Sequence, residues 1–424
     1  MPAALFCFRQ PNSGFPPAIF RLRQRVFHCG QVNSAFRQRN FPFRHTIFRS
    51  RQQDRPVRQS ILTVRQLVFR RRQVTRSLLV AVRKDWPSAK TNDEVTSRRD
   101  LSKIGEPVFT SDMNVSVIIC SHNPRAEYLR RVLDALKLQT LPVDQWELLL
   151  VDNASREPLA AAWDLSWQPH ARHLREEKTG LTHARLCGIA AAQGELLVFV
   201  DDDNVLRSDY LEVCLKISVE YPHLGAWGGS CIAEFETAPP EELRPWLGGL
   251  VIEQLKTPVW AKLPKWTEAG PAGAGLVLRQ IQAKCYRELV LKDPVRQSLG
   301  RSGTALAAGE DGDMVLCGFK LGLGAGRFPE LELTHLIPAQ RLTLKYLEGI
   351  HEGFGYGNAL LEAIHQPGYS LARPRFQHIR IFLLNLYLLA AGRNRVARRI
   401  MLANQRGRLR AYHVLKESGY HQST

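Results

Sequence analysis

The amino-acid sequence predicts an α/β fold in which helices flank a mostly parallel sheet and a helical, basic region follows on the C-terminal side. From Met113 onward, short β-branched apolar runs alternate with segments whose apolar residues recur at helical spacing, which is the pattern of βαβ units. Polar residues follow the predicted strands directly, as is typical of such sheets when they bind ligands. Before Met113 no strand or helix period persists, so an irregular or disordered segment is predicted there.

The α/β pattern assigns its first elements in chain order. Strands are predicted at the compact apolar runs and helices at the longer periodic segments, with Gly194 closing the helix before the third long strand. The expected elements are a strand at 115–120, a helix at 128–136, a strand at 146–153, a helical stretch after Pro158, a short strand at 173–175, a helix at 181–194, a strand at 196–200 and a helix at 210–219.

Three aspartates, Asp201 to Asp203, follow the apolar run 196–200, which is typical of a strand buried on both faces of a parallel sheet. Two carboxylates about 4 Å apart repel by roughly 4 kcal/mol at an effective dielectric constant of about 20, so something must compensate their clustering. A solvated turn that begins a helix, with Asp203 or Asn204 as the N-cap, is one interpretation. A cation or ligand bound by the carboxylates is the other.

Polar residues also follow the first two predicted strands. Ser121 and Asn123 come after the first, and Asp152 and Asn153 come after the second. Because parallel strands end at the same edge of a sheet, we expect these side chains to lie near the aspartates. Asp152 suits a ribose or base contact, by analogy with dinucleotide-binding folds, although the sequence contains neither GxGxxG after the first strand nor a P-loop.

The charge of the chain is basic at both ends and acidic between them. The net charge is +15 over residues 1–112, −7 over 113–370 and +10 over 371–424. Residues 1–80 contain 16 Arg, no Lys and 10 of the 18 Phe. Three interpretations of this segment are open: an organelle presequence, a nucleic-acid-binding segment, or a segment outside a native protein that starts at Met113. We favour the third, because phosphate binding would not exclude Lys.

The predicted domains are therefore an N-terminal extension at 1–112, an α/β domain at 113–347 and a basic helical region at 348–424. The eight cysteines form no CxxC pair and no zinc-site spacing with histidines, which predicts free thiols in a reducing compartment. No secretory signal and no apolar stretch of about 18 residues is found, so a cytoplasmic protein without a spanning helix is expected.

A resemblance rests on six motifs that occur in order: VSVIICSHN, VDNAS, KTGLTHARLCGI, FVDDDN, GAGLVLR and GEDGDM. From Met113 to about Leu347 the chain resembles a family 2 glycosyltransferase of the GT-A, Rossmann-like fold. The resemblance implies an inverting enzyme that uses a nucleotide-sugar donor. Gln340 and Arg341 stand where some relatives carry the QxxRW motif of processive synthases, and the incomplete match argues against processive synthesis.

The resemblance implies a metal site at the aspartates. Asp201 and Asp203 are similar to the family's DxD motif, which binds Mg²⁺ or Mn²⁺ on the donor diphosphate. A hard dication favours carboxylate oxygens and would compensate their repulsion. His335, in ELTHLIPAQR, lies where many relatives place a residue near the diphosphate, and we expect either a third metal ligand or a structural histidine there.

The acidic segment GEDGDM is expected to supply the catalytic base. An inverting displacement requires a general base for the acceptor hydroxyl. Glu310 and Asp311 match the family's ED pair, so we assign the base to Asp311 and an orienting role to Glu310. The alternative is that these acids, like Asp313, only favour the N-terminus of the following helix.

Further residues are expected at the nucleotide-sugar site. Lys178 and Arg185 could meet phosphate or lie on a solvated helix face, and Gly273 and Gly275 could admit the donor to the backbone or shape a turn. The full expected set is Ser121, Asn123, Asp152, Lys178, Arg185, Asp201, Asp202, Gly273, Gly275 and Arg341.

The C-terminal region combines an apolar run at 381–391 with many arginines after it. Such a helix can lie in the membrane interface, or it can form a helical pair on the catalytic domain with a solvated basic face. We therefore expect a transferase of polysaccharide or glycolipid biosynthesis with a carbohydrate or lipid-linked acceptor, peripheral at the inner face of the cell membrane and not bound to nucleic acid. The rival interpretations are an inactive nucleotide-sugar-binding protein and a basic nucleic-acid-binding protein.

Overall fold

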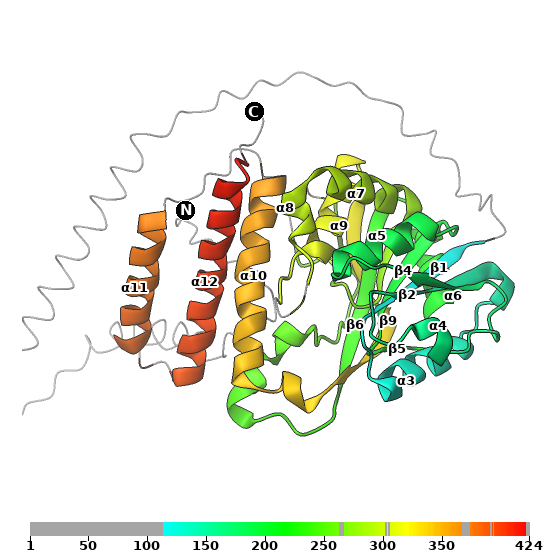
Figure 1. Cartoon of the computed structure of the whole chain (residues 1–424), viewed down its shortest axis with the longest axis horizontal. Helices are drawn as coiled ribbons and strands as arrows, with labels where there is room; N and C mark the ends of the chain where they lie inside the picture. Colours follow the sequence, from blue (N-terminus) through cyan, green and yellow to red (C-terminus); the bar gives the residue numbers. More distant parts are fainter. Residues whose placement is uncertain are drawn as a thin grey trace, which may run out of the picture. The chain divides into compact units, whose positions relative to one another are not determined.

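The computed structural model describes residues 113–262, 267–301, 303, 306–366, 374–390, 392 and 394–420 (Figure 1). The expectations for residues 1–112 lie outside the described residues. Within them, the α/β fold class with helices on both faces of a sheet and a helical C-terminal region is confirmed.

The first half of the sheet is parallel, with the strand order β3-β2-β1-β4. Buried apolar runs form each of the three long strands, as their sequences predict. The strands are β1 (Val115–Ser121), β2 (Trp146–Asp152), β3 (Ala171–Arg175) and β4 (Leu196–Asp201). The register pairs Ser121 with Asp152 and Cys120 with Asp201, so the polar ends of β1, β2 and β4 lie side by side.

The second half of the sheet is mixed, because β8 joins β4 and β6 in antiparallel pairing while β6 and β9 run parallel. Its strands are β5 (Asn204–Leu206), β6 (Leu224–Phe235), β7 (Val259–Ala261), β8 (Leu276–Arg279) and β9 (Gly324–Ile337). The antiparallel pair β5–β9 sets Asn204 opposite His335. This pairing brings the end of β9 to the aspartates that precede β5.

Apolar side chains alternate along the strands and fill a core on each face of the sheet. Val117 belongs to the core cluster that includes Leu129 of α3, and Ile118 belongs to the cluster that includes Met314 of α9. The helices of this domain are α3 (Ala126–Lys137), α4 (Leu159–Ala162), α5 (Leu181–Ala191), α6 (Tyr210–Glu220), α7 (Gln280–Lys292), α8 (Pro294–Gln297) and α9 (Glu310–Lys320). Short 3₁₀ helices occupy Val143–Gln145, Glu241–Leu250 and Ala339–Arg341.

Three long helices follow the sheet: α10 (Leu344–His365), α11 (Pro374–Ala390) and α12 (Arg395–Glu417). In Figure 1, α12 lies between α10 and α11 and packs against both. Glycines allow α10 and α12 to approach closely, since a Cβ on Gly355 would collide with the Asn404 carbonyl. Among the described residues, no helix is long and apolar enough to cross a membrane.

Candidate active site

A cavity of about 1900 Å³ opens at the carboxyl ends of the parallel strands. It is larger than the roughly 300–1,000 Å³ of most small-molecule sites. Predicted site residues that line it are Ser121, Arg185, Asp201, Asp202, Asp203, Gly273, Glu310, Asp311, His335 and Arg341. The cavity therefore gathers predicted site residues that are up to 220 positions apart in the chain.

The three aspartates do not form a solvated helix start. The chain continues from Asp203 into β5, and the next helix, α6, begins only at Tyr210. Asp203 is buried, and Asp202 accepts a hydrogen bond of 2.5 Å from the Ser121 hydroxyl. Burial, together with the neighbouring charge of Asp203, raises the pKa of Asp202 to about 7. The N-cap interpretation is therefore wrong, and the carboxylates belong to the cavity.

Asp203 has two basic neighbours from the end of β9 and the turn after it. Arg341 Nη2 lies 2.8 Å from Asp203 Oδ2, and His335 Nε2 lies 3.6 Å from the same oxygen. Burial alone would raise the pKa of Asp203, but His335 and Arg341 outweigh it and lower that pKa. Asp203 is thus held as a carboxylate in a buried position.

The hydrogen bonds of His335 define its tautomer. Nδ1 donates to the Leu250 carbonyl oxygen at 3.1 Å, so a neutral ring would carry its lone pair on Nε2. Nε2 lies 3.0 Å from Arg341 Nη1, and His335 lines the cavity. A backbone carbonyl behind a histidine is the usual support of a metal-ligating imidazole. Carboxylate oxygens and an imidazole nitrogen suit a divalent cation, but the assignment of Asp201, Asp203 and His335 as its ligands stays a prediction; Arg341 is the counter-ion of Asp203.

Arg185 joins the two acidic groups of the cavity. Its buried guanidinium lies 3.7 Å from Asp201 Oδ1 and 3.7 Å from Glu310 Oε2. Burial opposes its charge, but Glu310 and Asp201 raise the pKa of Arg185 further. The predicted basic residue of the helix at 181–194 is therefore a buried bridge and does not lie on a solvated helix face.

Glu310 and Asp311 stand at the first turn of α9 and differ in their partners. Asp311 accepts hydrogen bonds of 2.9 Å from the N–H groups of Gly273 and Gly312. Neither oxygen of Glu310 accepts a hydrogen bond from any residue in the described part of the chain. Burial, partly offset by Arg185, raises the pKa of Glu310 to about 7. Asp311 is thus fixed by the backbone, whereas Glu310 is a weakly compensated carboxyl at the cavity wall.

Four predicted residues lie outside the cavity lining. Asp152 accepts from the N–H groups of Ser155 and Leu159 and pairs with Arg175, so it organises the loop after β2. The other three are Asn123, which accepts from the N–H of Arg156 through its side chain; Lys178, which is exposed; and Gly275, whose carbonyl oxygen accepts from Tyr210. Their assignment to the nucleotide-sugar site stays a prediction.

The cavity also contains residues that the motifs did not single out as binding residues. Asn153 lines it and holds the loop before α5 through bonds to Lys178 O and Gly180 N, at 2.8 and 2.7 Å. Its position at the end of β2 is the signal that could have identified it. Arg301 lines the cavity from a segment without a strand or helix period, so no local pattern marks it.

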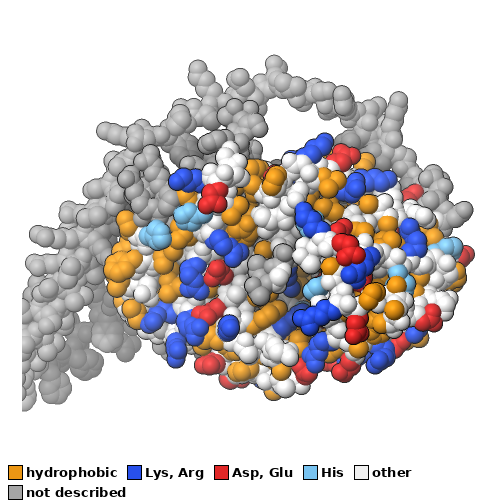
Figure 2. Space-filling view, viewed as in Figure 1, with side chains coloured by type: hydrophobic (Ala, Val, Ile, Leu, Met, Phe, Trp, Pro, Cys, Tyr) orange, Lys and Arg blue, Asp and Glu red, His pale blue; other side chains and the backbone are white. Residues whose placement is uncertain are grey.

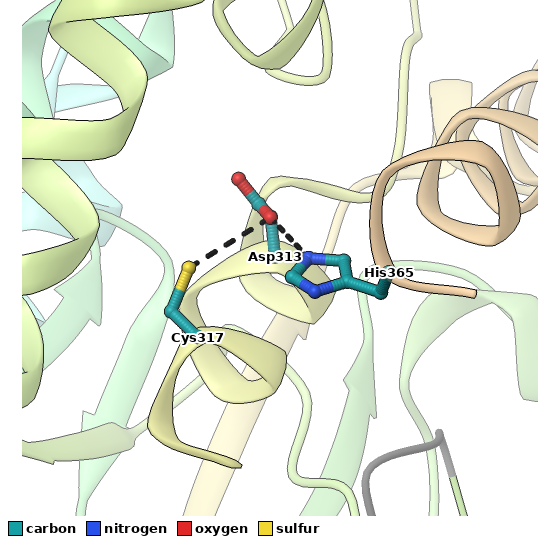
Figure 3. A group of neighbouring side chains, drawn as sticks. All are labelled: Asp313, Cys317 and His365. Atoms are coloured by element: carbon teal, nitrogen blue, oxygen red, sulfur yellow. Dashed lines mark hydrogen bonds and ion pairs between the residues drawn. The ribbon is translucent and has the colours of Figure 1, made fainter. Parts of the chain in front are cut away.

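A second polar cluster joins Asp313 and Cys317 of α9 to His365 of α10 (Figure 3). His365 Nε2 and Cys317 Sγ both contact Asp313 Oδ1, at 2.5 and 3.9 Å. The Arg296 guanidinium also donates to Asp313 and lies 3.5 Å from Cys317 Sγ. The buried, positively charged guanidinium contacts the same Asp313 and Cys317 atoms that a metal would need. An ion-pair network therefore fits these residues better than a metal site. Asp313, expected to act at the helix N-terminus, anchors α9 to α8 and α10.

The fold and the cavity together define an α/β protein with a carboxylate-lined ligand site at the carboxyl ends of its parallel strands, as in many nucleotide-binding proteins. Residues 116–256 match the family model described as Glycosyl transferase family 2. The matched residues make up about a third of the chain, and the match agrees with the resemblance that its motifs carry. The match includes β1 to β6 and the three aspartates.

Two curated relatives come from Haloferax volcanii. Glycosyltransferase AglE is 33% identical over 101 residues, which are 23% of this chain and 33% of AglE. Glucosyl-dolichyl phosphate glucuronosyltransferase is 24% identical over 132 residues, 30% of this chain and 42% of that protein. The chain thus spans less than half the length of these relatives. Among solved structures, S. aureus TarS 1-349 in complex with UDP is similar, with 15% identity, a TM-score of 0.40 and coverage of 65% of this chain and 72% of that one.

Proposed function

We propose that the chain transfers a sugar from a nucleotide-diphosphate sugar to a hydroxyl acceptor, with inversion and with a divalent cation, Mg²⁺ or Mn²⁺. The observation that carries the proposal is that Asp201 to Asp203 and the Glu310–Asp311 pair line one cavity. Arg185 contacts one carboxylate of each group. The match to glycosyl transferase family 2 supports the same reaction class.

Asp311 is proposed as the general base. In an inverting displacement the acceptor oxygen attacks the anomeric carbon opposite the leaving diphosphate and gives up its proton. The N–H groups of Gly273 and Gly312 each bond one oxygen of Asp311 and thereby fix the carboxylate plane. The remaining lone pairs can accept the hydroxyl proton. Glu310 beside it would bind and orient acceptor hydroxyls.

Asp201, Asp203 and His335 would hold the cation. When bound, the cation neutralises charge that develops on the departing nucleoside diphosphate. Arg341 lies 2.8 Å from Asp203, and the diphosphate would meet its guanidinium beside the cation. Arg185 would hold Asp201 and Glu310 in place. The protein thus places positive groups at the leaving-group side and a base at the acceptor side.

Further donor contacts are proposed around this centre. The Ser121 hydroxyl and Asp202 form a hydrogen-bonded pair at the cavity wall that could bind the ribose or the donor sugar. Gly273 lacks a side chain between Arg185 and Asp311, which leaves room for the sugar. We also propose donor contacts by four residues outside the cavity lining: Asn123, Asp152, Lys178 and Gly275.

The acceptor is proposed to be a carbohydrate or a lipid-linked saccharide in polysaccharide or glycolipid biosynthesis. A relative whose name includes glucosyl-dolichyl phosphate supports a lipid-linked acceptor. We further infer a cytoplasmic protein with peripheral contact at the inner face of the cell membrane, supported by the basic C-terminal region. The acidic lining of the cavity gives no reason to expect nucleic acid.

The test is a panel of UDP- and GDP-sugars with Mn²⁺ or Mg²⁺, in which release of the nucleoside diphosphate is measured. Asp203→Ala should abolish metal-dependent donor binding. Asp311→Asn should slow release by about 10²–10⁴-fold while donor affinity stays within a few-fold. Asp134→Asn, an exposed change on α3 away from the cavity, is the matched control and should behave as wild type.

Each outcome distinguishes one part of the proposal. Full activity of Asp311→Asn would refute the assignment of the base. Metal-dependent donor binding without turnover for any acceptor would favour the inactive nucleotide-sugar-binding protein. If no donor binds with either metal, the proposed function is wrong.

A further inference from the structure

The cavity does not end at the carboxylates but continues between the three C-terminal helices. Side chains of α10, α11 and α12 line this continuation, which we call the helical arm; its apolar members include Ile350, Phe354, Leu383, Tyr387, Ile400 and Met401. Because the arm and the carboxylates belong to one cavity, a single molecule can occupy both. Such a molecule would have a polar end at Asp311 and an apolar end among the helices.

The outer surface of α11 is apolar as well. Six large hydrophobic side chains between positions 379 and 389 are between 46% and 64% exposed, and Figure 2 shows hydrophobic side chains gathered over this helix. Their spacing places them on one side of α11. Contiguous apolar surface of this kind on a soluble domain marks contact with another apolar body. Leu383 and Tyr387 belong both to this surface and to the arm, so the arm opens at the apolar face.

Part of the basic charge of α12 is compensated within the fold. Arg399, Arg406 and Arg408 pair with Glu348, Glu352 and Glu362 of α10, respectively. These ion pairs hold α12 on α10 and reduce the positive charge that the helices offer to an anionic surface. What α11 still offers is apolar area, and this favours a hydrocarbon occupant over an anionic one.

We propose that the helical arm binds the hydrocarbon chain of a lipid-linked acceptor, whose saccharide end reaches Asp311. The inference deepens the proposed glycosyl transfer and rests on it for the identity of the polar end. The length of α11, 17 residues, corresponds to about 25 Å at about 1.5 Å per residue, enough to cover a long alkyl or prenyl chain. A bound hydrocarbon chain would also account for a cavity that is larger than a usual nucleotide-sized site.

The test measures how affinity depends on chain length at a constant, uncharged head. Methyl, hexyl and octyl β-D-glucoside, all below their micelle concentrations, are titrated into the full chain by equilibrium dialysis. Each methylene that enters the arm should tighten binding by up to about fourfold, so octyl glucoside should bind at least about a hundredfold more tightly than methyl glucoside. Equal affinities of the three glucosides would overturn the proposal.

A pair of matched variants on α11 tests the location. Leu383→Ser changes an exposed leucine that lines the arm, and Leu386→Ser changes an exposed leucine on the same face that does not. Leu383→Ser should weaken octyl glucoside binding by about tenfold, whereas Leu386→Ser should leave it unchanged within about twofold. Equal losses in both variants would overturn the arm as the site and indicate nonspecific adsorption to the helix surface.

Donor binding is measured in the same samples, so that the two proposals fail separately. Donor binding without chain-length dependence would overturn the arm and leave the proposed transfer standing. A second outcome is that glucoside affinity depends on chain length, Leu383→Ser removes this dependence, and no donor binds. This outcome would support the arm as a hydrocarbon site and overturn the proposed transfer. Binding to phosphatidylcholine vesicles is compared between wild type and the two variants. If the vesicles bind all three proteins equally while Leu383→Ser alone loses octyl glucoside binding, the arm is supported as the hydrocarbon site.

Discussion

Replacing Glu310 by Gln is expected to stabilise the metal-free fold above neutral pH. The Glu310 carboxyl is 3% exposed, and its oxygens accept no hydrogen bond within the described part of the chain. Burial, only partly offset by Arg185, raises the pKa of this carboxyl from 4.5 to about 7. The ionised side chain is therefore less favourable in the folded protein than in the unfolded chain.

The magnitude follows from the difference between the two pKa values. The folded protein keeps this proton to a higher pH than the unfolded chain does. The contribution of Glu310 to stability is therefore fully present below about pH 4.5 and lost as the pH rises through about pH 7. A difference of about 2.5 pKa units corresponds to about 3 kcal/mol of unfolding free energy. Gln does not ionise, so the variant avoids this loss, less the cost of the weakened contact with Arg185.

The assay is urea unfolding in EDTA at about pH 5 and about pH 8.5, with Glu147→Gln as the control. Glu147 is also buried, but it accepts bonds of 2.6 Å from the Ser116 hydroxyl, the Gln193 N–H and Arg172. Its replacement should therefore destabilise the fold by about 1–3 kcal/mol at both pH values. The reasoning is refuted if Glu310→Gln is no more stable than wild type at the higher pH.

Three other substitutions follow from contacts of the site. Arg341→Met should lower the unfolding free energy in EDTA by about 3 kcal/mol, because it leaves the Asp203 carboxylate buried with less compensation, and calorimetry should show partial recovery with Mn²⁺. Gly273→Ala would place a Cβ 3.1 Å from an Arg185 nitrogen and should slow nucleotide release about tenfold with little change in melting temperature. Arg296→Met should cost about 3–5 kcal/mol in urea unfolding, which Zn²⁺ should not restore, because Asp313 is fully buried.

The parallel half of the sheet could be predicted from sequence because its signals are local. The runs of β1, β2 and β4 are mostly apolar and are buried on both faces of the sheet, and each ends in a polar residue. Parallel pairing then requires the ends to meet, which the register of Cys120 with Asp201 confirms. Nothing beyond strand period and sheet geometry was needed to expect Ser121 beside the aspartates.

The partners of the aspartates could not be predicted in the same way. His335 and Arg341 reach Asp203 only because β5, a three-residue strand, pairs antiparallel with the end of β9. So short a strand has no detectable period, and its pairing depends on the whole mixed half of the sheet. The role of Asp152 illustrates the converse: the residue lies at the expected strand end, but its carboxylate turns to the N–H groups of its own loop.

Charge compensation in the cavity is uneven, and the unevenness separates the roles of the carboxylates. Asp203 has Arg341 at 2.8 Å and Asp202 has the Ser121 hydroxyl, whereas Glu310 has Arg185 at 3.7 Å, shared with Asp201, and the neighbouring Thr182 hydroxyl. A buried carboxyl with so little compensation changes its protonation with the charges that enter beside it: a cation favours the ionised form and a diphosphate the neutral one. The fold thus gives up stability at Glu310, beside the proposed base. Natural proteins leave buried groups poorly compensated mainly at functional sites. The weakly compensated Glu310 is therefore the strongest physical reason to look for the chemistry at the Glu310–Asp311 pair.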